Sequence, residues 1–326
     1  MAKQTPTGRS ARSAGARAVR APPRPAASPT DRSPRPEDPA NRLVLSVHDA
    51  EVPEHLFRRL VGAYLGGAQQ MVVREDPTLR PATRAVIRTF CRRTDRMEIE
   101  RDDGASIVLQ DQDEVGEALL GPRLRRMGEM VRAFHREAVG SWSRLPMGEE
   151  SSWNHDDDAL DREAWWLERH AALRLRDRPG ETEALGAWTV ARSLERIADH
   201  AVVLGEAGGR LASLHYDRRT LTTLEQFHRQ AMEHLEGVLA ATDDAGANDL
   251  LDMGEALMAS GRALADRLLP AVNDGSMPPA TAAAVTRILE SITRTVAYAQ
   301  DIAQVVLDRS VAVGPPRLAA PLLTAP

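Results

Sequence analysis

Hydrophobic and polar residues follow two different patterns along the 326 residues of this chain. Between about residues 41 and 113, short β-branched runs alternate with helical stripes. From there to residue 311, apolar residues recur at steps of three and four, the spacing of one face of an α-helix. The pattern therefore predicts a mainly α protein, in which a small α/β segment precedes two tandem three-helix bundles.

The α/β segment, residues 41–113, reads as a βαβαββ unit. Pro53 lies where a first helical turn would begin, and a glycine pair after Leu65 would end that helix. The turn signal at Asp102–Gly104 stands between two short apolar runs and predicts a hairpin. We expect strands at residues 42–47, 70–74, 96–100 and 106–110, and helices at residues 53–65 and 81–93.

Six helices are predicted in the second region, separated by breaks rich in Pro, Gly and Asp. They cover residues 114–145, 157–177, 181–210, 220–242, 247–269 and 279–311. Asp199 and Asp301 lie about 100 residues apart in similar helical settings, which supports an internal repeat. We therefore place the first bundle at residues 114–215 and the second at residues 216–312.

The two ends of the chain differ from the rest in composition. Residues 1–40 hold eight of the 21 prolines and eight basic against three acidic residues, so we expect a disordered basic tail. Residues 313–326 are rich in Pro and Ala and are also expected to be loose. Outside the basic tail there are 34 basic and 44 acidic residues, a net charge of −10. An acidic body argues against nucleic-acid binding by the body itself.

Composition also indicates the cellular compartment in which the protein is expected. Cys91 is the only cysteine, so an intrachain disulfide framework is excluded. The N-terminal residues lack the apolar core of a signal peptide, and no apolar run is long enough to span a membrane. We expect a cytoplasmic protein.

The stretch 191–206 contains residues that could bind a metal ion. Glu195 and Asp199 stand four residues apart at the edge of its apolar stripe, and like charges at that spacing repel each other. Asp157 and Asp161 repeat the spacing on the preceding predicted helix. Antiparallel packing of the two helices would bring four carboxylates together. Hard oxygen ligands of this kind suit Mg²⁺, Mn²⁺, Ca²⁺ or iron.

A structural interpretation of the same acids stands beside the metal site. Arg162, Arg192 and Arg196 are close enough in sequence to neutralise them. His200 follows Asp199 and points about 100° away from it around the helix, so we assign it no ligand role. Trp188 continues the apolar stripe of the helix, and the five tryptophans are expected to anchor cores and interfaces.

The same stretch resembles the signature helix of PhoU proteins, the phosphate-uptake regulators. The signature reads Arg-x-x-Glu-Arg-Ile-x-Asp-His, and it is matched in place by Arg192, Glu195, Arg196, Ile197, Asp199 and His200. Residues 157–162 look like the other acidic motif of the family, and residues 298–307 resemble the corresponding helix of a second repeat. Residues 41–311 as a whole are similar to archaeal-type members, without the AbrB-like domain with which those usually begin.

The resemblance implies two similar three-helix bundles and a metal cluster bound by Glu/Asp-x-x-x-Asp motifs, with iron among the metals. Carried over, the ligands of one Fe, Mn or Mg cluster in the first bundle would be Asp157, Asp161, Glu195 and Asp199. In the second repeat Ala297 stands where the first acid should be, which leaves Asp301 alone. Asp252 and Glu255 are irregularly spaced, so a second cluster is not expected.

For function, the resemblance implies a cytoplasmic, non-enzymatic regulator of phosphate uptake and phosphate homeostasis. It would restrain a phosphate transporter or its sensor kinase through protein contacts and form a homodimer. One alternative is a DNA-binding transcriptional regulator of phosphate genes that uses the basic tail or the α/β segment. Another is a metal-dependent hydrolase built on the carboxylates.

Overall fold

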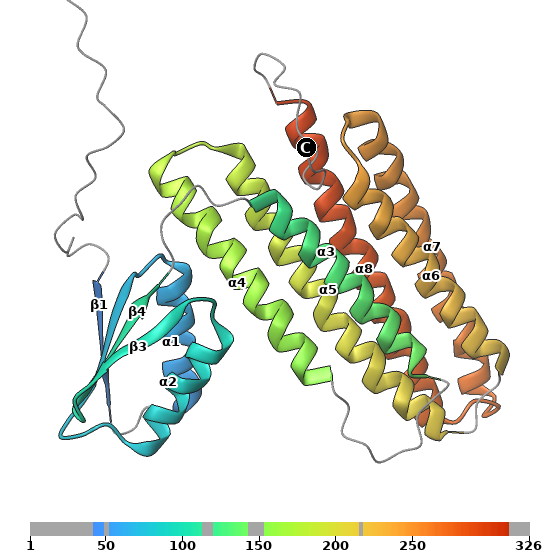
Figure 1. The fold of residues 1–326 in the computed structure, drawn as a ribbon. Coiled ribbons are helices and arrows are strands. Elements are labelled where there is room, and N and C mark those ends of the chain that lie inside the picture. Colours follow the sequence, from blue (N-terminus) through green and yellow to red (C-terminus); the bar gives the residue numbers. More distant parts are fainter. Residues whose placement is uncertain (1–41, 49–51, 113–119, 143–152, 215–217, 313–326) are drawn as a thin grey trace, which may run out of the picture. The chain divides into compact units, whose positions relative to one another are not determined.

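The computed structural model describes residues 42–48, 52–112, 120–142, 153–214 and 218–312. Within these ranges the protein is mainly α, with a small four-stranded sheet before the helical region, as the sequence predicts (Figure 1). The expectations for residues 1–40 and 313–326 fall outside the described residues. The same holds for both ends of the helix predicted at residues 114–145.

The α/β segment has the predicted βαβαββ order. Its elements are β1 (Arg42–Val47), α1 (Pro53–Leu65), β2 (Gln70–Glu75), α2 (Pro81–Arg93), β3 (Met97–Asp102) and β4 (Ser106–Asp111). The strand order in the sheet is β1-β2-β4-β3, with β1 parallel to β2 and the other pairs antiparallel. Strand β3 begins one residue and ends two residues later than predicted, and it carries a register shift between Ile99 and Arg101.

Proline begins both helices of this segment. Pro53 and Pro81 occupy the first helical turn, where the missing N–H is not needed. Alternate strand residues and one face of each helix then form a common core. Leu60, Ile87 and Leu109 are fully buried in it, from α1, α2 and β4.

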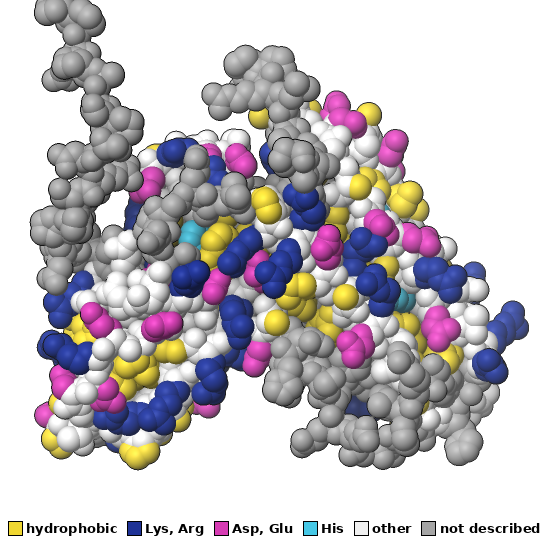
Figure 2. All heavy atoms as spheres, in the orientation of Figure 1, with side chains coloured by type: hydrophobic (Ala, Val, Ile, Leu, Met, Phe, Trp, Pro, Cys, Tyr) yellow, Lys and Arg dark blue, Asp and Glu magenta, His cyan; other side chains and the backbone are white. Residues whose placement is uncertain are grey.

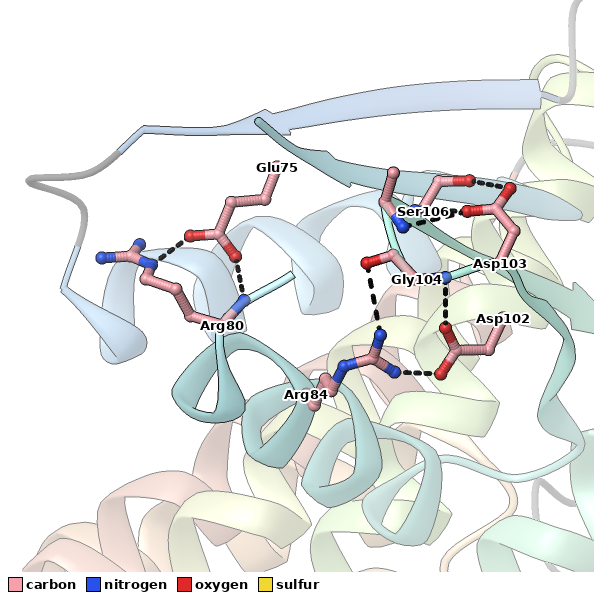
Figure 3. Close-up of polar contacts among 8 residues, drawn as sticks. Glu75, Arg80, Arg84, Asp102, Asp103, Gly104 and Ser106 are labelled. Carbon is pink, nitrogen blue, oxygen red and sulfur yellow. Dashed lines mark hydrogen bonds and ion pairs between the residues drawn. The ribbon is translucent and has the colours of Figure 1, made fainter. Parts of the chain in front are cut away.

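Side chains fix the loops at one end of the α/β segment (Figure 3). The Asp103 carboxylate accepts hydrogen bonds from the backbone N and the hydroxyl of Ser106, at 2.7 and 2.9 Å. This closes the β3–β4 turn, where Gly104 has a φ of 93°. Arg84 of α2 pairs with Asp102 and donates to the Gly104 carbonyl at 3.3 Å. The helix is therefore tied to the hairpin that the sequence predicted.

Six helices follow: α3 (Leu120–Gly140), α4 (Trp153–Asp177), α5 (Thr182–Ser213), α6 (Arg218–Ala240), α7 (Asp244–Asn273) and α8 (Pro279–Ser310). Helices α3 and α4 pack on α5, while α6 and α7 pack on α8. Figure 1 shows α8 between α5 and the α6–α7 pair, and α5 and α8 share the most extensive helix contact.

The two sets of three helices share one hydrophobic core. It runs without interruption from Leu124 on α3 to Ala303 on α8. The α5–α8 contact is close because Gly186 faces Val305, where a Cβ would lie 3.0 Å from the valine Cγ1. On α5, Leu194 and Ala198 of the predicted stripe are buried, but Trp188 is not: 36% of it is exposed. Trp188 lies at the edge of the core, with the Arg192 guanidinium 5.6 Å from its ring centroid.

A buried arginine connects α4 to the α/β segment. Arg169 is 1% exposed, and its Nη2 lies 2.5 Å from Oδ2 of Asp111, the last residue of β4. The same guanidinium donates to the backbone carbonyl of Tyr64 and lies over that ring, 4.7 Å from its centroid. Both charges of the pair are almost fully removed from water, so each depends on the other.

None of the helices that the structure describes combines the length and the apolarity needed to cross a bilayer.

Candidate metal centre

Helices α4 and α5 pack against each other and bring the four predicted carboxylates into one electrostatic neighbourhood. Asp157 and Asp161 project from adjacent turns of α4, and Glu195 and Asp199 from adjacent turns of α5. Burial, followed by repulsion from Asp199 and Asp161, raises the pKa of Glu195 to about 7. Because Asp161 belongs to the other helix, the two carboxylate pairs act on each other across the helix contact.

The other three carboxyl groups are shifted in the same direction. Burial, followed by repulsion from Asp157, raises the pKa of Asp161 to about 6. Burial also raises the pKa of Asp157, and that of Asp199, to which the charge of Asp157 contributes. The ionised form of this cluster is thus held at a cost, which a nearby cation would relieve.

The arginines beside these acids in the sequence have other partners. Arg192 pairs with Glu168 at 3.2 Å, and Arg196 donates to the hydroxyl of Tyr298 at 3.4 Å. Arg162 donates to a backbone carbonyl at the end of α2, at 2.7 Å. The expected neutralisation by Arg162, Arg192 and Arg196 is therefore not made by direct ion pairs in the described structure, although Arg196 lowers the pKa of Asp199 through its charge.

The arginine ion pairs are formed instead with acids next to the cluster. Arg93 of α2 pairs with Asp158, and its charge partly offsets the raised pKa of Asp157 and Asp161. Among the residues that the structure describes, none of the four candidate ligands forms an ion pair with an arginine. The cluster is therefore left with an excess of negative charge.

Whether the cluster can bind a metal ion also depends on how its side chains are placed. In the described part of the chain, no three His, Cys, Asp or Glu side chains form a group that could hold one metal ion as they stand. The donor chemistry of the cluster fits a hard cation, because carboxylate oxygens are the ligands that Mg²⁺, Mn²⁺ and iron accept. Convergence of three of them on one ion would require the side chains to turn.

The corresponding region of the second helix set is different. Asp301 on α8 is exposed, and burial of its carboxyl raises its pKa while Arg196 lowers it. Ala297 precedes it at the position of an acid, and Asp252 and Glu255 are exposed on α7. Asp252 and Glu255 line a shallow hollow of about 670 Å³ together with Arg262, away from the α4–α5 carboxylates.

Sequence reasoning missed a buried histidine pair that fixes the position of α5. His135 on α3 and His228 on α6 are 0% and 5% exposed, and their rings stack with centroids 5.4 Å apart. Nε2 of His135 lies 2.8 Å from the carbonyl oxygen of Ile197, between the two α5 carboxylates in sequence. No spacing rule pairs residues 93 positions apart, so only the fold reveals them.

A comparison with known protein families identifies a domain in the helical region. Residues 124–207 match the PhoU domain, a stretch that runs from α3 to α5 and contains all four carboxylates. None of the curated proteins compared with the chain matches it. The signature helix identified in the sequence lies inside the matched residues. The protein thus carries a PhoU domain at residues 124–207, as its resemblance to the PhoU family predicted.

Proposed function

We propose that this protein is a PhoU-type regulator of phosphate uptake and phosphate homeostasis. The observation that carries the proposal is the coincidence of the PhoU domain match with the helices that bear the acidic cluster. The role is non-enzymatic and is exerted through contacts with a phosphate transporter or its sensor kinase. Its output is restraint of transport when phosphate is abundant.

Phosphate uptake by cells that lack the protein tests this role. We expect the rate of phosphate uptake in phosphate-rich medium to rise when the chain is absent and to return to normal when it is restored. The variant Asp157→Asn/Glu195→Gln/Asp199→Asn should fail to restore it. Unchanged uptake in the absence of the protein would overturn the proposal.

The acidic cluster would serve as a cation site within this regulator. Asp157, Asp161, Glu195 and Asp199 would hold iron, manganese or magnesium, which supplies the positive charge that their arginine neighbours do not. Support comes from the raised pKa values and from the lack of direct ion pairs to these four groups among the described residues. A bound cation would join α4 to α5 and make the acidic face of these helices rigid.

Metal content of the purified protein tests the cation site directly. We expect stoichiometric metal in the unmodified chain, purified without chelator, and its loss in the triple variant. The control variant Asp252→Asn/Glu255→Gln/Asp266→Asn removes the same charge from exposed positions on α7 and should keep the metal. Equal metal content in all three proteins would refute the site and leave the regulatory role to be judged by phosphate uptake.

A homodimer is also part of the proposal. Leu185 and Trp188, three residues apart on α5, are 53% and 36% exposed and give this helix an apolar outer face. Light scattering of the unmodified chain should give the mass of two copies, and Leu185→Gln/Trp188→Gln should give one. A single-copy mass for the unmodified chain would exclude the dimer.

A further inference from the structure

The two helices of the α/β segment carry charge of almost one sign. They contain a single acid, Glu54, against six arginines: Arg58, Arg59, Arg84, Arg88, Arg92 and Arg93. Figure 2 shows Arg side chains gathered along this part of the surface. The chain outside residues 1–40 has a net charge of −10, so this surface opposes the charge of the protein around it. The net charge of the sequence as a whole does not reveal this local positive charge.

Three of these arginines form one row on α2. Arg84, Arg88 and Arg92 follow one another at steps of four, so they lie along one stripe of the helix. The residues that α2 buries, which include Ile87 and Phe90, point elsewhere. Arg88 and Arg92 are exposed and Arg84 is partly exposed. The 13 residues of α2 give the row a helix about 20 Å long.

Hydrogen bonds orient Arg84 and Arg92, but most of the positive charge of the row is not paired with a carboxylate among the described residues. Arg84 is anchored by Asp102 and by the Gly104 carbonyl (Figure 3). Arg92 donates to the hydroxyl of Thr89 at 3.0 Å, which orients the guanidinium without neutralising it. Within the described residues, neither Arg88 nor Arg92 has an acidic partner within ion-pair distance.

The surface suits a polyanion better than an apolar protein partner. No large hydrophobic residue of α1 or α2 is among the exposed ones, whereas protein interfaces usually contain apolar or aromatic anchors. Guanidinium groups bind phosphate oxygens in a bidentate manner, and phosphate contacts supply most of the sequence-independent affinity for DNA. An α-helix also fits the major groove of duplex DNA, which is roughly 12 Å wide.

We propose that the arginine row of α2, made of Arg84, Arg88 and Arg92, docks on the phosphate backbone of double-stranded DNA. The proposed contacts are to phosphate oxygens, which are the same at every base pair, so the contact is independent of base sequence. The row lies on α2 and the four carboxylates on α4 and α5, and no carboxylate takes part in the contact, so this inference does not depend on the proposed regulation of phosphate uptake.

Salt-dependent binding of the full chain to a 30-base-pair duplex of random sequence tests the contact. The unmodified chain should bind at low salt, with log affinity falling linearly against log salt concentration. Arg88→Ala/Arg92→Ala should weaken binding at least tenfold and lower the slope by about 2, since each lost phosphate contact lowers it by about 0.9. The basic tail of residues 1–40 is present in every protein compared, so it cannot produce the difference.

A matched control removes the same charge elsewhere. Arg262 and Arg267 are exposed on α7, and Arg262→Ala/Arg267→Ala should bind like the unmodified chain. Equal weakening by the two double variants would overturn the docking site, as would no binding by the unmodified chain at low salt. Competition by a polyglutamate peptide that matches the DNA charge for charge would reassign the row to an acidic protein. Circular dichroism should show the same helix content in all three proteins.

Discussion

Nδ1 of His135 lies 3.2 Å from Nε2 of His228, and together with the contact of His135 to the Ile197 carbonyl this assigns the tautomers of both rings. The carbonyl of Ile197 can only accept, so Nε2 of His135 carries a proton and its Nδ1 must accept. Nε2 of His228 is therefore the donor to His135. His228 on α6 thus donates to His135 on α3, which in turn donates to the α5 segment that bears Glu195 and Asp199.

The His135–His228 pair predicts an unusual order of stabilities. His228→Leu leaves Nδ1 of His135 buried without a donor, which should lower the free energy of unfolding by about 1–3 kcal/mol. His135→Leu/His228→Leu removes both polar partners and should cost less than the single change. Urea denaturation of the three proteins measures this. A double variant that loses more stability than His228→Leu would contradict the pairing.

The same histidines predict a loss of stability in mild acid. Burial lowers the pKa of His135 to about 4 and that of His228 to about 3, both from an ordinary value of 6.5. Below pH 6.5 the unfolded chain takes up protons that the folded chain refuses, so the free energy of unfolding falls as the pH falls toward 4. At pH 5 the loss should reach up to about 2 kcal/mol for each histidine.

Comparison with the double leucine variant isolates this effect. Other titrating groups are common to both proteins, so their contributions cancel in the difference. Between pH 7 and pH 5, urea denaturation should show a larger loss for the unmodified chain than for His135→Leu/His228→Leu. Parallel pH profiles would show that the two rings are protonated as easily in the folded protein as in the unfolded one.

The Arg169–Asp111 pair should be costly to break from one side. Arg169→Ala removes the guanidinium beside the carboxylate of Asp111, a side chain that is 8% exposed in the unmodified protein, and this should lower the free energy of unfolding by about 3–5 kcal/mol. The control is Arg287→Ala, which removes an ion pair to Glu206 whose side chains are 50% and 48% exposed. It should cost less than about 1 kcal/mol. Similar thermal melts for both variants would refute the buried pair.

Two glycines should respond to alanine in opposite directions. A Cβ at Gly208 would lie 1.9 Å from Cδ1 of Trp142, whose Nε1 is bonded to the Leu204 carbonyl at 3.0 Å. Since the ring cannot move without losing that bond, Gly208→Ala should destabilise the protein by about 1–3 kcal/mol. Gly62 on α1 has open space around it, so Gly62→Ala should stabilise by about 0.5–1 kcal/mol. Destabilisation by both would indicate a backbone effect instead of the clash.

Local signals account for the elements that were predicted well. Proline at the first turn placed the starts of α1, α2 and α8, and the Asp-Asp-Gly turn placed the β3–β4 hairpin. These features act within a few residues of each other, so the sequence contains them completely. The four carboxylates belong to the same class, because residues four apart on a helix must share a face.

Features that depend on packing between distant helices were not predictable. The stripe of α5 suggested a buried Trp188, yet its position at the edge of the helix contact leaves it exposed. Arg192 was expected to neutralise the cluster, but Glu168 on α4 lies closer to it. The His135–His228 pair and the buried Arg169 likewise depend on helices that meet only after folding.

The shared core of α5 and α8 has a consequence for how damage spreads through the molecule. Ile292 on α8 is fully buried in the core that also contains Leu194 of α5, although the two residues are 98 positions apart. Neither three-helix set can come apart without exposing the apolar face of the other. In a genetic screen, loss-of-function alleles should therefore map along the whole of α8 as well as to the carboxylates. A substitution that disrupts the packing of α8 should unfold all six helices in one cooperative transition.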